Sequence, residues 1–258
     1  MEWEIATQSH RGNVRPTNED ALLADRHYPL LMVADGMGGH AAGEVASQML
    51  AGQLAALRLA GNLPQALEQV RSTVEQCNQD MIAYGRTHLA GQTIGSTVVA
   101  MLAQDFQGAC VWAGDSRLYR ARHAQLEQLT GDHSHVAELV RAGRLSAAEA
   151  VNHPSSHAIT RAVGAAPALD LDLTTFDIRP GDTYLLCSDG LYHEVSPEEI
   201  VASMLAVDIR RSARHLLNLC LGRRARDNIS FIIGRPLGPG GDPDATLTYY
   251  PDTGAESP

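Results

Sequence analysis

Short apolar runs of β-strand length, each bounded by glycine or polar residues, limit the fold more than any other feature of this chain. They occupy residues 30–34, 97–102, 109–113, 184–187 and 229–233. Runs this short, with breakers nearby, are typical of buried strands. Residues 118–129 add a predicted hairpin that turns near His123 and Ala124. The core is therefore predicted to be rich in β-sheet.

Four longer stretches predict helices in two groups. Residues 44–59 and 64–86 carry apolar side chains at helical spacing and should form an antiparallel pair. Residues 197–205 and 209–221 repeat the pattern, and the first of them begins with a capping signature at residues 196–199. Between the groups, the polar segment 133–164 is expected to be a surface flap that borders the functional site, with a short helix over 136–142.

Composition fits a single domain that folds without a partner. Hydrophobic residues make up 44% of the 258 residues and charged residues 19%, which is enough apolar surface for a substantial core. We expect this domain to cover residues 1–235 and to be a monomer. Residues 236–258 begin with a cluster of proline and glycine and are predicted to be a flexible C-terminal tail.

Charge and targeting signals exclude several classes of partner. The formal net charge of −10 disfavours nucleic acid, because its phosphates would be repelled. The N-terminus has no secretory signal, and no apolar run is long enough to span a membrane. The four cysteines are scattered without a CxxC pair, which fits reduced thiols. A cytoplasmic location without membrane contact is therefore expected.

The most informative residues are aspartates at the ends of predicted strands. Asp35, Asp115 and Asp189 each follow an apolar run, and Asp227 precedes one. A single aspartate in such a position is most often a turn or cap residue. If the four strand ends converge, the carboxylates repel one another unless cations neutralise them. Hard cations such as Mg²⁺ and Mn²⁺ prefer carboxylate oxygen, so a divalent metal site is predicted.

Motifs around these aspartates occur in the order found in one protein family. They are RPTNED at 15–20, DGMGGH at 35–40, GST at 95–97, AGDSR at 113–117, LTGDHS at 129–134, TRAVG at 160–164, SDGL at 188–191 and DN at 227–228. With this ordered set the chain resembles the metal-dependent PPM (PP2C-type) serine/threonine protein phosphatases, particularly the small bacterial ones. The resemblance covers about residues 3–234.

The resemblance implies an α+β fold, a four-layer αββα sandwich in which two antiparallel β-sheets are flanked by helices. It also implies that the metals lie at one edge of this sandwich. Periodicity alone predicts the strands and the helix pairs, whereas the layering comes from the resemblance.

The resemblance also implies a set of metal ligands for two divalent ions per chain, Mn²⁺ or Mg²⁺. Asp35 would bridge the two ions, with the carbonyl of Gly36 on one ion and Asp189 and Asp227 on the other. Glu19 and Asp20 would hold water molecules bound to the metals. A water between the two ions loses its proton near neutral pH, and the resulting hydroxide is the implied nucleophile.

A third, weaker ion is implied at Asp115, together with Asp189. Some members of the family carry a further aspartate four residues after the one matched by Asp189, but this chain has His193 there. A hard cation prefers carboxylate oxygen, so the third site is expected to be weaker or differently formed here.

Two further residues are implied to act on the phosphate. Arg15 matches the family's phosphate-binding arginine, whose guanidinium suits bidentate contact with two oxygens, and a surface ion pair is the alternative. His40 matches the proposed general acid that protonates the leaving alkoxide, and a turn histidine without a catalytic role is the alternative.

The arginines before Asp227 depart from the family pattern, because Arg224 stands where a glycine is common. Together with the arginines of the preceding helix they recruit an acidic or phosphorylated substrate or form a solvated helix face; they are residues 210, 211, 214, 223, 224 and 226. The flap histidines lack metal-ligand spacing, and most of them are expected to be exposed loop residues rather than a zinc site; they are residues 133, 135, 153 and 157.

The leading hypothesis is a protein phosphatase that hydrolyses phosphoserine and phosphothreonine and opposes a bacterial serine/threonine kinase. Its partners would be phosphorylated proteins, including that kinase or its substrates. A catalytically silent phosphatase-like domain would predict loss of a metal aspartate, and none is lost. A metal hydrolase acting on small phosphoesters or nucleotides would use the same metals, and this alternative stays open.

Overall fold

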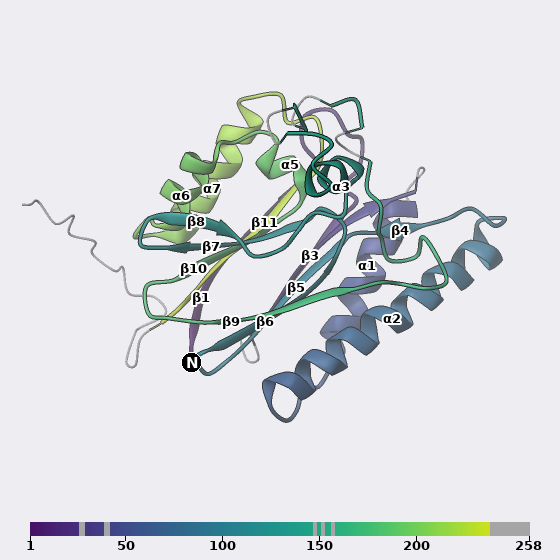
Figure 1. Ribbon diagram of the computed structural model, residues 1–258, viewed down its shortest axis with the longest axis horizontal. Helices are drawn as coiled ribbons and strands as arrows, with labels where there is room; N and C mark the ends of the chain where they lie inside the picture. Colours follow the sequence, from purple (N-terminus) through teal and green to yellow (C-terminus); the bar gives the residue numbers. More distant parts are fainter. Residues whose placement is uncertain (26–28, 39–41, 147–148, 151–152, 156–157, 238–258) are drawn as a thin grey trace, which may run out of the picture.

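The computed structural model describes residues 1–25, 29–38, 42–146, 149–150, 153–155 and 158–237. Its strands form two antiparallel sheets that lie face to face, with helices on both outer faces (Figure 1). The first sheet has the order β1 (Trp3–His10), β11 (Ile229–Pro236), β10 (Thr183–Cys187), β7 (Arg117–Arg122), β8 (Gln125–Gln128). The second has the order β2 (Asp20–Asp25), β3 (Leu30–Met37), β5 (Val98–Gln104), β6 (Gln107–Ala113), β9 (Asp172–Asp177), and the short β4 (Gly95–Ser96) pairs with β3. The predicted four-layer αββα sandwich is confirmed.

Side chains along each strand alternate between two apolar layers, as the pleat of a strand requires. In β3, Leu30 and Met32 pack against the helices, whereas Leu31 and Val33 pack against the other sheet. In β10, Leu186 also belongs to the layer between the sheets. Every second residue of β3, counted from Leu31 and Val33 to the end of the strand, therefore points into this layer between the sheets.

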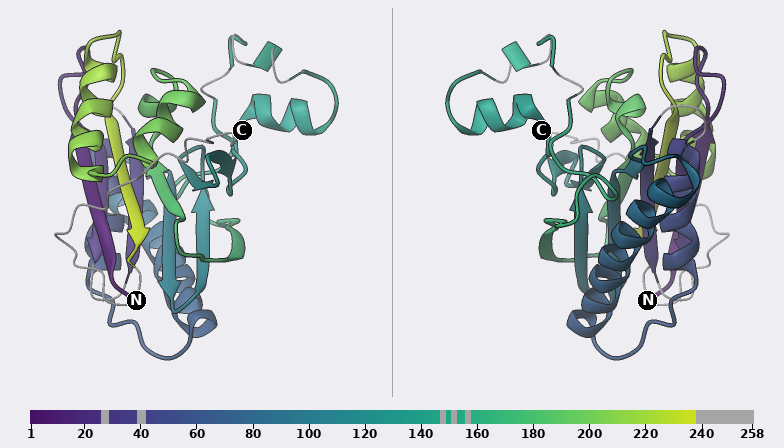
Figure 2. Two further views of the ribbon diagram at one scale, coloured as in Figure 1. Left: turned by 90° about the vertical axis from the view of Figure 1, so that its left-hand side faces the viewer. Right: turned by 90° about the vertical axis from the view of Figure 1, so that its right-hand side faces the viewer.

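Helices cover the outer face of each sheet. α1 (Ala42–Ala55) and α2 (Leu63–His88) pack on the six-stranded sheet, and α6 (Pro197–Met204) and α7 (Ile209–Leu221) pack on the five-stranded sheet (Figure 2). Both predicted helix pairs are present, and α7 has the predicted bounds. The predicted capping of α6 is confirmed, since Ser196 Oγ accepts from the Glu199 N–H at 3.3 Å and Glu199 Oε2 accepts from the Ser196 N–H at 2.9 Å.

Local turn chemistry accounts for the hairpin, and pairing accounts for three strands that patterning does not predict. His123 and Ala124 both have positive φ, 50° and 58°, as the two-residue hairpin turn between β7 and β8 requires. β1 and β2 mix charged with apolar residues, and β9 lies at the edge of its sheet with alternating exposure. β1 is extended because it pairs with β11 over eight residues.

β11 continues into the segment predicted as a tail. It ends at Pro236, and Leu237 donates its N–H to Glu2 O at 2.8 Å. The rest of the predicted tail lies outside the described residues. Among the helices of the described ranges, none combines the length and the apolar character that a membrane span needs.

The flap leaves the sandwich after β8 and returns at residue 163. It carries α3 (His135–Arg141), which stands beyond the ends of the sheets in Figure 2. At its return, Val163 and Ser96 exchange backbone hydrogen bonds of 2.9 Å in each direction. The base of the flap is therefore joined to β4, next to the end of β3.

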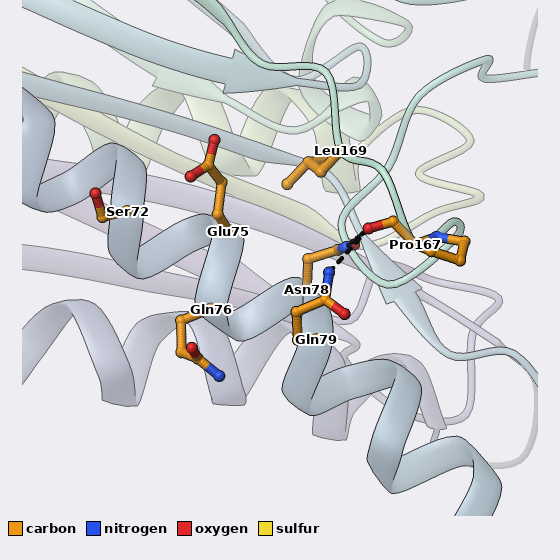
Figure 3. Close-up of a pocket in the computed structure, with 7 residues that line it drawn as sticks. All are labelled: Ser72, Glu75, Gln76, Asn78, Gln79, Pro167 and Leu169. Atoms are coloured by element: carbon orange, nitrogen blue, oxygen red, sulfur yellow. Dashed lines mark hydrogen bonds between the residues drawn. The ribbon is translucent and has the colours of Figure 1, made fainter.

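Asn78 of α2 anchors the chain just beyond the flap. Its side chain is fully buried; Oδ1 accepts from the Gly164 N–H at 2.6 Å and Nδ2 donates to Ala166 O at 3.0 Å. Gln79, the exposed next residue, donates to Pro167 O at 2.8 Å, and Figure 3 shows both amides directed at this loop. The base of the flap is thus fixed to α2 by buried amide hydrogen bonds.

Replacing Asn78 with alanine is expected to lower the free energy of unfolding by about 2–4 kcal/mol, because it leaves buried backbone groups unsatisfied. Urea denaturation checks this value. Gln79→Ala is the matched control, since it removes a hydrogen bond to the same loop from an exposed side chain. Equal, small effects of both changes would show that the buried amide is not the anchor.

Candidate functional site

Antiparallel pairing brings the strand-end aspartates to one end of the sandwich. β2 begins where β3 ends, and β11 begins where β10 ends. Asp20 opens β2 and Asp35 lies near the end of β3. Asp189 follows β10, Asp227 precedes β11, and Asp115 lies between β6 and β7. All five carboxylates therefore come from loops and strand ends on the same side of the molecule.

Asp35 is the centre of this group of carboxylates. It lies directly opposite Asp20 in the β2–β3 pair and points into the layer between the sheets, in phase with Leu31 and Val33. Burial raises the pKa of Asp35 well above its ordinary value, and the surrounding carboxylates raise it further; they are Asp20, Asp189, Asp115 and Asp227. Burial also raises the pKa of Asp20 to about 7. Like charges placed in this way repel one another, so the cluster destabilises the fold without a counter-charge.

The backbone of Asp35 is held by the GST segment. Its N–H donates to Thr97 Oγ1 at 3.0 Å, and its carbonyl accepts from the Thr97 N–H at 2.8 Å and from Ser96 Oγ at 3.0 Å. Thr97 Oγ1 also lies 2.7 Å from Ser116 Oγ, beside Asp115. The hydroxyls of this segment therefore position the central aspartate, a role that the sequence pattern alone does not reveal.

Two glycines let the end of β3 touch the first turn of α1. A Cβ on Gly36 would lie 2.0 Å from Gly43 O and 2.6 Å from Glu19 O, and one on Gly43 would lie 2.9 Å from Glu19 Cδ. The Gly36 N–H donates to Glu19 O at 3.1 Å, and Ser47 Oγ donates to the same oxygen at 2.5 Å. Any larger residue would push Glu19 away from Gly36, so this close approach places the Glu19 side chain beside the site.

Tyr192 connects the segments that carry Asp115 and Asp189. Tyr192, in the short helix α5 (Asp189–Tyr192), donates its hydroxyl to Asp115 O at 3.1 Å. The Arg117 guanidinium lies 3.5 Å from the centroid of the Tyr192 ring and pairs with Asp132 at 2.6 Å. Burial raises the pKa of Asp115 to about 7, and the charges of Asp189 and Asp132 contribute. Sequence patterning does not indicate this support by Arg117 and Tyr192.

Arg15 and Asp227 form an ion pair at the rim of the site. Arg15 Nη2 lies 2.7 Å from Asp227 Oδ2, and the two side chains are 50% and 38% exposed. The hydrogen bond to Asp227 is the main cause that raises the pKa of Arg15. The surface ion pair weighed as an alternative for Arg15 is present, but its partner is one of the predicted metal ligands.

Asn228 joins the loop that carries Arg15 and Glu19 to the start of β11. Its Nδ2 donates to Arg11 O at 3.0 Å and to Thr17 O at 2.9 Å, and its Oδ1 accepts from the Glu19 N–H at 2.8 Å. The DN motif at 227–228 therefore supplies a loop anchor as well as a carboxylate.

The predicted histidines have different outcomes. His40 and His157 lie outside the described residues. His193 Nδ1 is 3.5 Å from Asp189 Oδ2, so the residue that replaces a family aspartate faces a predicted metal ligand.

The flap histidines of the described ranges differ in exposure. His135 is exposed as expected, and His153 is half-buried. His133 is buried, stacks on Trp112 and lies with Nε2 3.2 Å from Asp172 Oδ2. These partners come from β6 and β9, which a local pattern cannot reveal.

The carboxylate group fits a hard divalent cation in its chemistry. Asp20 Oδ2 accepts from Ser188 Oγ at 2.9 Å, whereas its buried Oδ1 has no hydrogen-bond partner among the described residues. In the part of the chain that the structure describes, no three His, Cys, Asp or Glu side chains stand close enough to hold an ion as they are. Asp227 is turned toward Arg15 and Asp189 toward His193. The donors are thus gathered at one place, and binding requires some of them to rotate.

Comparison with known proteins gives related phosphatases. The family model for protein phosphatase 2C matches residues 8–221. The serine/threonine protein phosphatase PstP of Mycobacterium tuberculosis is 38% identical over 231 residues, which cover 88% of this chain and 44% of that protein. The chain thus spans less than half the length of this relative. The serine/threonine phosphatase stp of Listeria monocytogenes is 35% identical over 206 residues, or 76% of this chain and 82% of that protein.

A solved structure extends the likeness to the whole sandwich. The catalytic domain of PstP, crystallised in complex with two manganese ions, has a TM-score of 0.81 and 36% identity, and the match covers 91% of this chain and 98% of that one. The family match spans most of the described residues, and the relatives exceed a third identity over most of this chain. The chain belongs to the protein phosphatase 2C family.

Proposed function

We propose that this chain is a metal-dependent serine/threonine protein phosphatase. The observation that carries the proposal is the gathering of five carboxylates at one end of the sandwich beside an exposed arginine. The relatives PstP and stp are named as serine/threonine phosphatases, which supports the same substrate class here. Its partners are then phosphorylated proteins, and we propose that it opposes a serine/threonine kinase in the cytoplasm.

Asp35 and its neighbours would hold two divalent ions, Mn²⁺ or Mg²⁺. The protein ligands would be Asp35, the carbonyl of Gly36, Asp189 and Asp227. Glu19 and Asp20 would hold waters bound to the ions. The complex of the PstP domain with two manganese ions supports this count. When bound, the ions supply positive charge that offsets the carboxylates and lowers the pKa of water at the site.

Arg15 and His40 act on the phosphate group in this proposal. The Arg15 guanidinium is half exposed at the rim of the site and offers two parallel N–H groups to phosphate oxygens. His40 donates a proton to the leaving oxygen of serine or threonine, a role suited to an imidazole that titrates near neutral pH. Water attacks phosphorus directly, in line with the leaving oxygen.

The cysteines are unsuited to act as nucleophiles. All four are buried. Burial raises the pKa of Cys77 and of Cys220 to about 12, so neither forms a thiolate near neutral pH. The burial of all four thiols therefore argues against a covalent phosphocysteine intermediate and supports direct hydrolysis.

The test is hydrolysis of a phosphothreonine peptide and a matched phosphotyrosine peptide, each with Mn²⁺ and with EDTA. We expect release of phosphate from phosphothreonine with Mn²⁺ and at most a trace with EDTA. Phosphothreonine turnover that survives EDTA would contradict the metal requirement. Hydrolysis of nucleotides or small phosphoesters in preference to both peptides would favour the alternative hydrolase.

A third ion at Asp115 is tested by the change His193→Asp. The new carboxylate replaces the imidazole beside Asp189, and we expect Mn²⁺ to bind the third site about tenfold more tightly, because a hard cation prefers oxygen. Equilibrium dialysis with Mn²⁺ measures the number and affinity of sites. His215→Asp, on the exposed face of α7, is the control. An unchanged affinity in His193→Asp would argue against a third site at this position.

A further inference from the structure

Arginines are concentrated in two loops beside the proposed site. The chain contains no lysine, and 5 of its 20 arginines lie within residues 11–15 and 223–226, which include no acidic residue. The chain as a whole carries a formal net charge of −10. These two loops therefore form a locally basic surface on an acidic protein.

Two of the five arginines form ion pairs in the described part of the chain, and three do not. Arg15 pairs with Asp227, and Arg223 Nη2 pairs with Glu199 at 2.6 Å. The other three are exposed and make no ion pair with any carboxylate of the described ranges; they are Arg11, Arg224 and Arg226. The Glu194 carboxylate accepts from the Arg224 backbone N–H at 3.3 Å rather than from its guanidinium. Their charge is thus available to a ligand.

The two loops are packed into one surface. The Asn13 N–H donates to Ala225 O at 2.8 Å, and a Cβ on Gly12 would lie 2.7 Å from the same oxygen. Ala225 is fully buried with a positive φ of 41°, and the residues on either side of it, Arg224 and Arg226, are exposed. The buried alanine fixes the loop and leaves both arginines at the surface.

An exposed apolar side chain lies within the same surface. Val14 is 67% exposed and stands between Arg11 and Arg15 in the chain. An apolar contact with charged groups around it is a common arrangement at a site that binds another protein chain.

We propose that Arg11, Val14, Arg224 and Arg226 bind the residues that flank the phosphorylated side chain of the substrate, and that the enzyme prefers phosphopeptides with anionic flanks. This inference rests on the proposed phosphatase function. Arg11 is four residues from Arg15, a distance of at most ~14 Å along the chain, so anionic groups within about four residues of the phosphorylated position can reach the surface. The anionic group is a carboxylate or a second phosphate, since a guanidinium binds either.

The experiment compares three phosphothreonine peptides with Mn²⁺: one with aspartate flanks, one with alanine flanks and one with a second phosphothreonine. We expect kcat/KM to be about tenfold higher for the anionic peptides, mainly through KM, because exposed ion pairs contribute equally to substrate and transition state. The preference should shrink as salt rises from about 50 to about 500 mM. The two anionic peptides separate carboxylate from phosphate as the preferred flank.

The triple variant Arg11→Ala, Arg224→Ala, Arg226→Ala should lose this preference and keep its turnover of p-nitrophenyl phosphate. Arg58→Ala is the control and should keep the preference. Arg58 is exposed and follows α1, the helix that packs on the six-stranded sheet. Lysine at the three positions should restore most of it, because the charge is retained. Equal kcat/KM for aspartate and alanine flanks, or a preference that persists in the triple variant, overturns the inference alone. Failure to hydrolyse any of the peptides overturns the proposed function with it.

Discussion

Asp35→Asn is expected to reduce Mn²⁺-dependent hydrolysis of a phosphothreonine peptide by a factor on the order of 10³ or more. Asparagine keeps the size of the side chain but removes the negative charge and one of the two carboxylate oxygens. Asp35 lies at the centre of the carboxylate group, with its backbone fixed by Thr97 and Ser96. Loss of this one charge should therefore remove the metals rather than the fold. Steady-state assays over a range of Mn²⁺ concentrations measure the effect.

Two controls separate loss of metal from loss of structure. Asp105→Asn changes an exposed aspartate in the turn after β5 and should leave activity unchanged. This turn lies at the opposite end of β5 from Thr97, which binds the backbone of Asp35. Without metal, Asp35→Asn itself should be more stable than the wild type, because it relieves repulsion among buried carboxylates. Turnover within a few-fold of wild type at saturating Mn²⁺ would refute the central role of Asp35.

Sequence patterning predicts those elements of the fold whose secondary structure is determined by their own residues. Apolar runs predict β3, β5, β6, β10 and β11, and capping residues predict the start of α6. Three strands that it does not predict, β1, β2 and β9, have compositions that become extended only through pairing with a partner. The four-layer arrangement could be expected only from the resemblance to a family. The alternation of side chains along a strand shows which face of the sheet each side chain lies on, but not whether a helix or a second sheet packs on that face.

The site, too, has a part that the sequence predicts and a part that it does not. Carboxylates at strand ends could be identified from the sequence, since each stands next to an apolar run. Their mutual placement depends on strand register, which sets Asp20 opposite Asp35, and register is decided by the packed faces of the whole sheet. The contacts of Tyr192 with Arg117 and with Asp115 join segments about 75 residues apart, a separation that local patterns do not encode.

Removal of divalent ions should make the stability of this protein fall as pH rises. Burial raises the pKa of Asp20 and of Asp115 to about 7, above the ordinary value of 3.8. Between these pH values the folded chain holds protons that the unfolded chain has released, so the free energy of unfolding decreases with rising pH. We expect the metal-free protein to lose a few kcal/mol between about pH 5 and about pH 8, or roughly 5–10 °C in Tm. Thermal unfolding in EDTA at the two pH values measures this loss.

Mn²⁺ should reverse the loss, because bound cations stabilise the charged form of these buried carboxylates. The rise in Tm on adding Mn²⁺ should therefore be larger at about pH 8 than at about pH 5. Asp35→Asn should flatten the pH dependence in EDTA, since it removes a carboxyl group whose own pKa is raised well above its ordinary value, and Asp105→Asn should not. A metal-free Tm that stays level or rises between the two pH values would show that the pKa values of these carboxyl groups are not raised in the folded chain. The same protein would then have no electrostatic reason to gather divalent cations at this end of the sandwich.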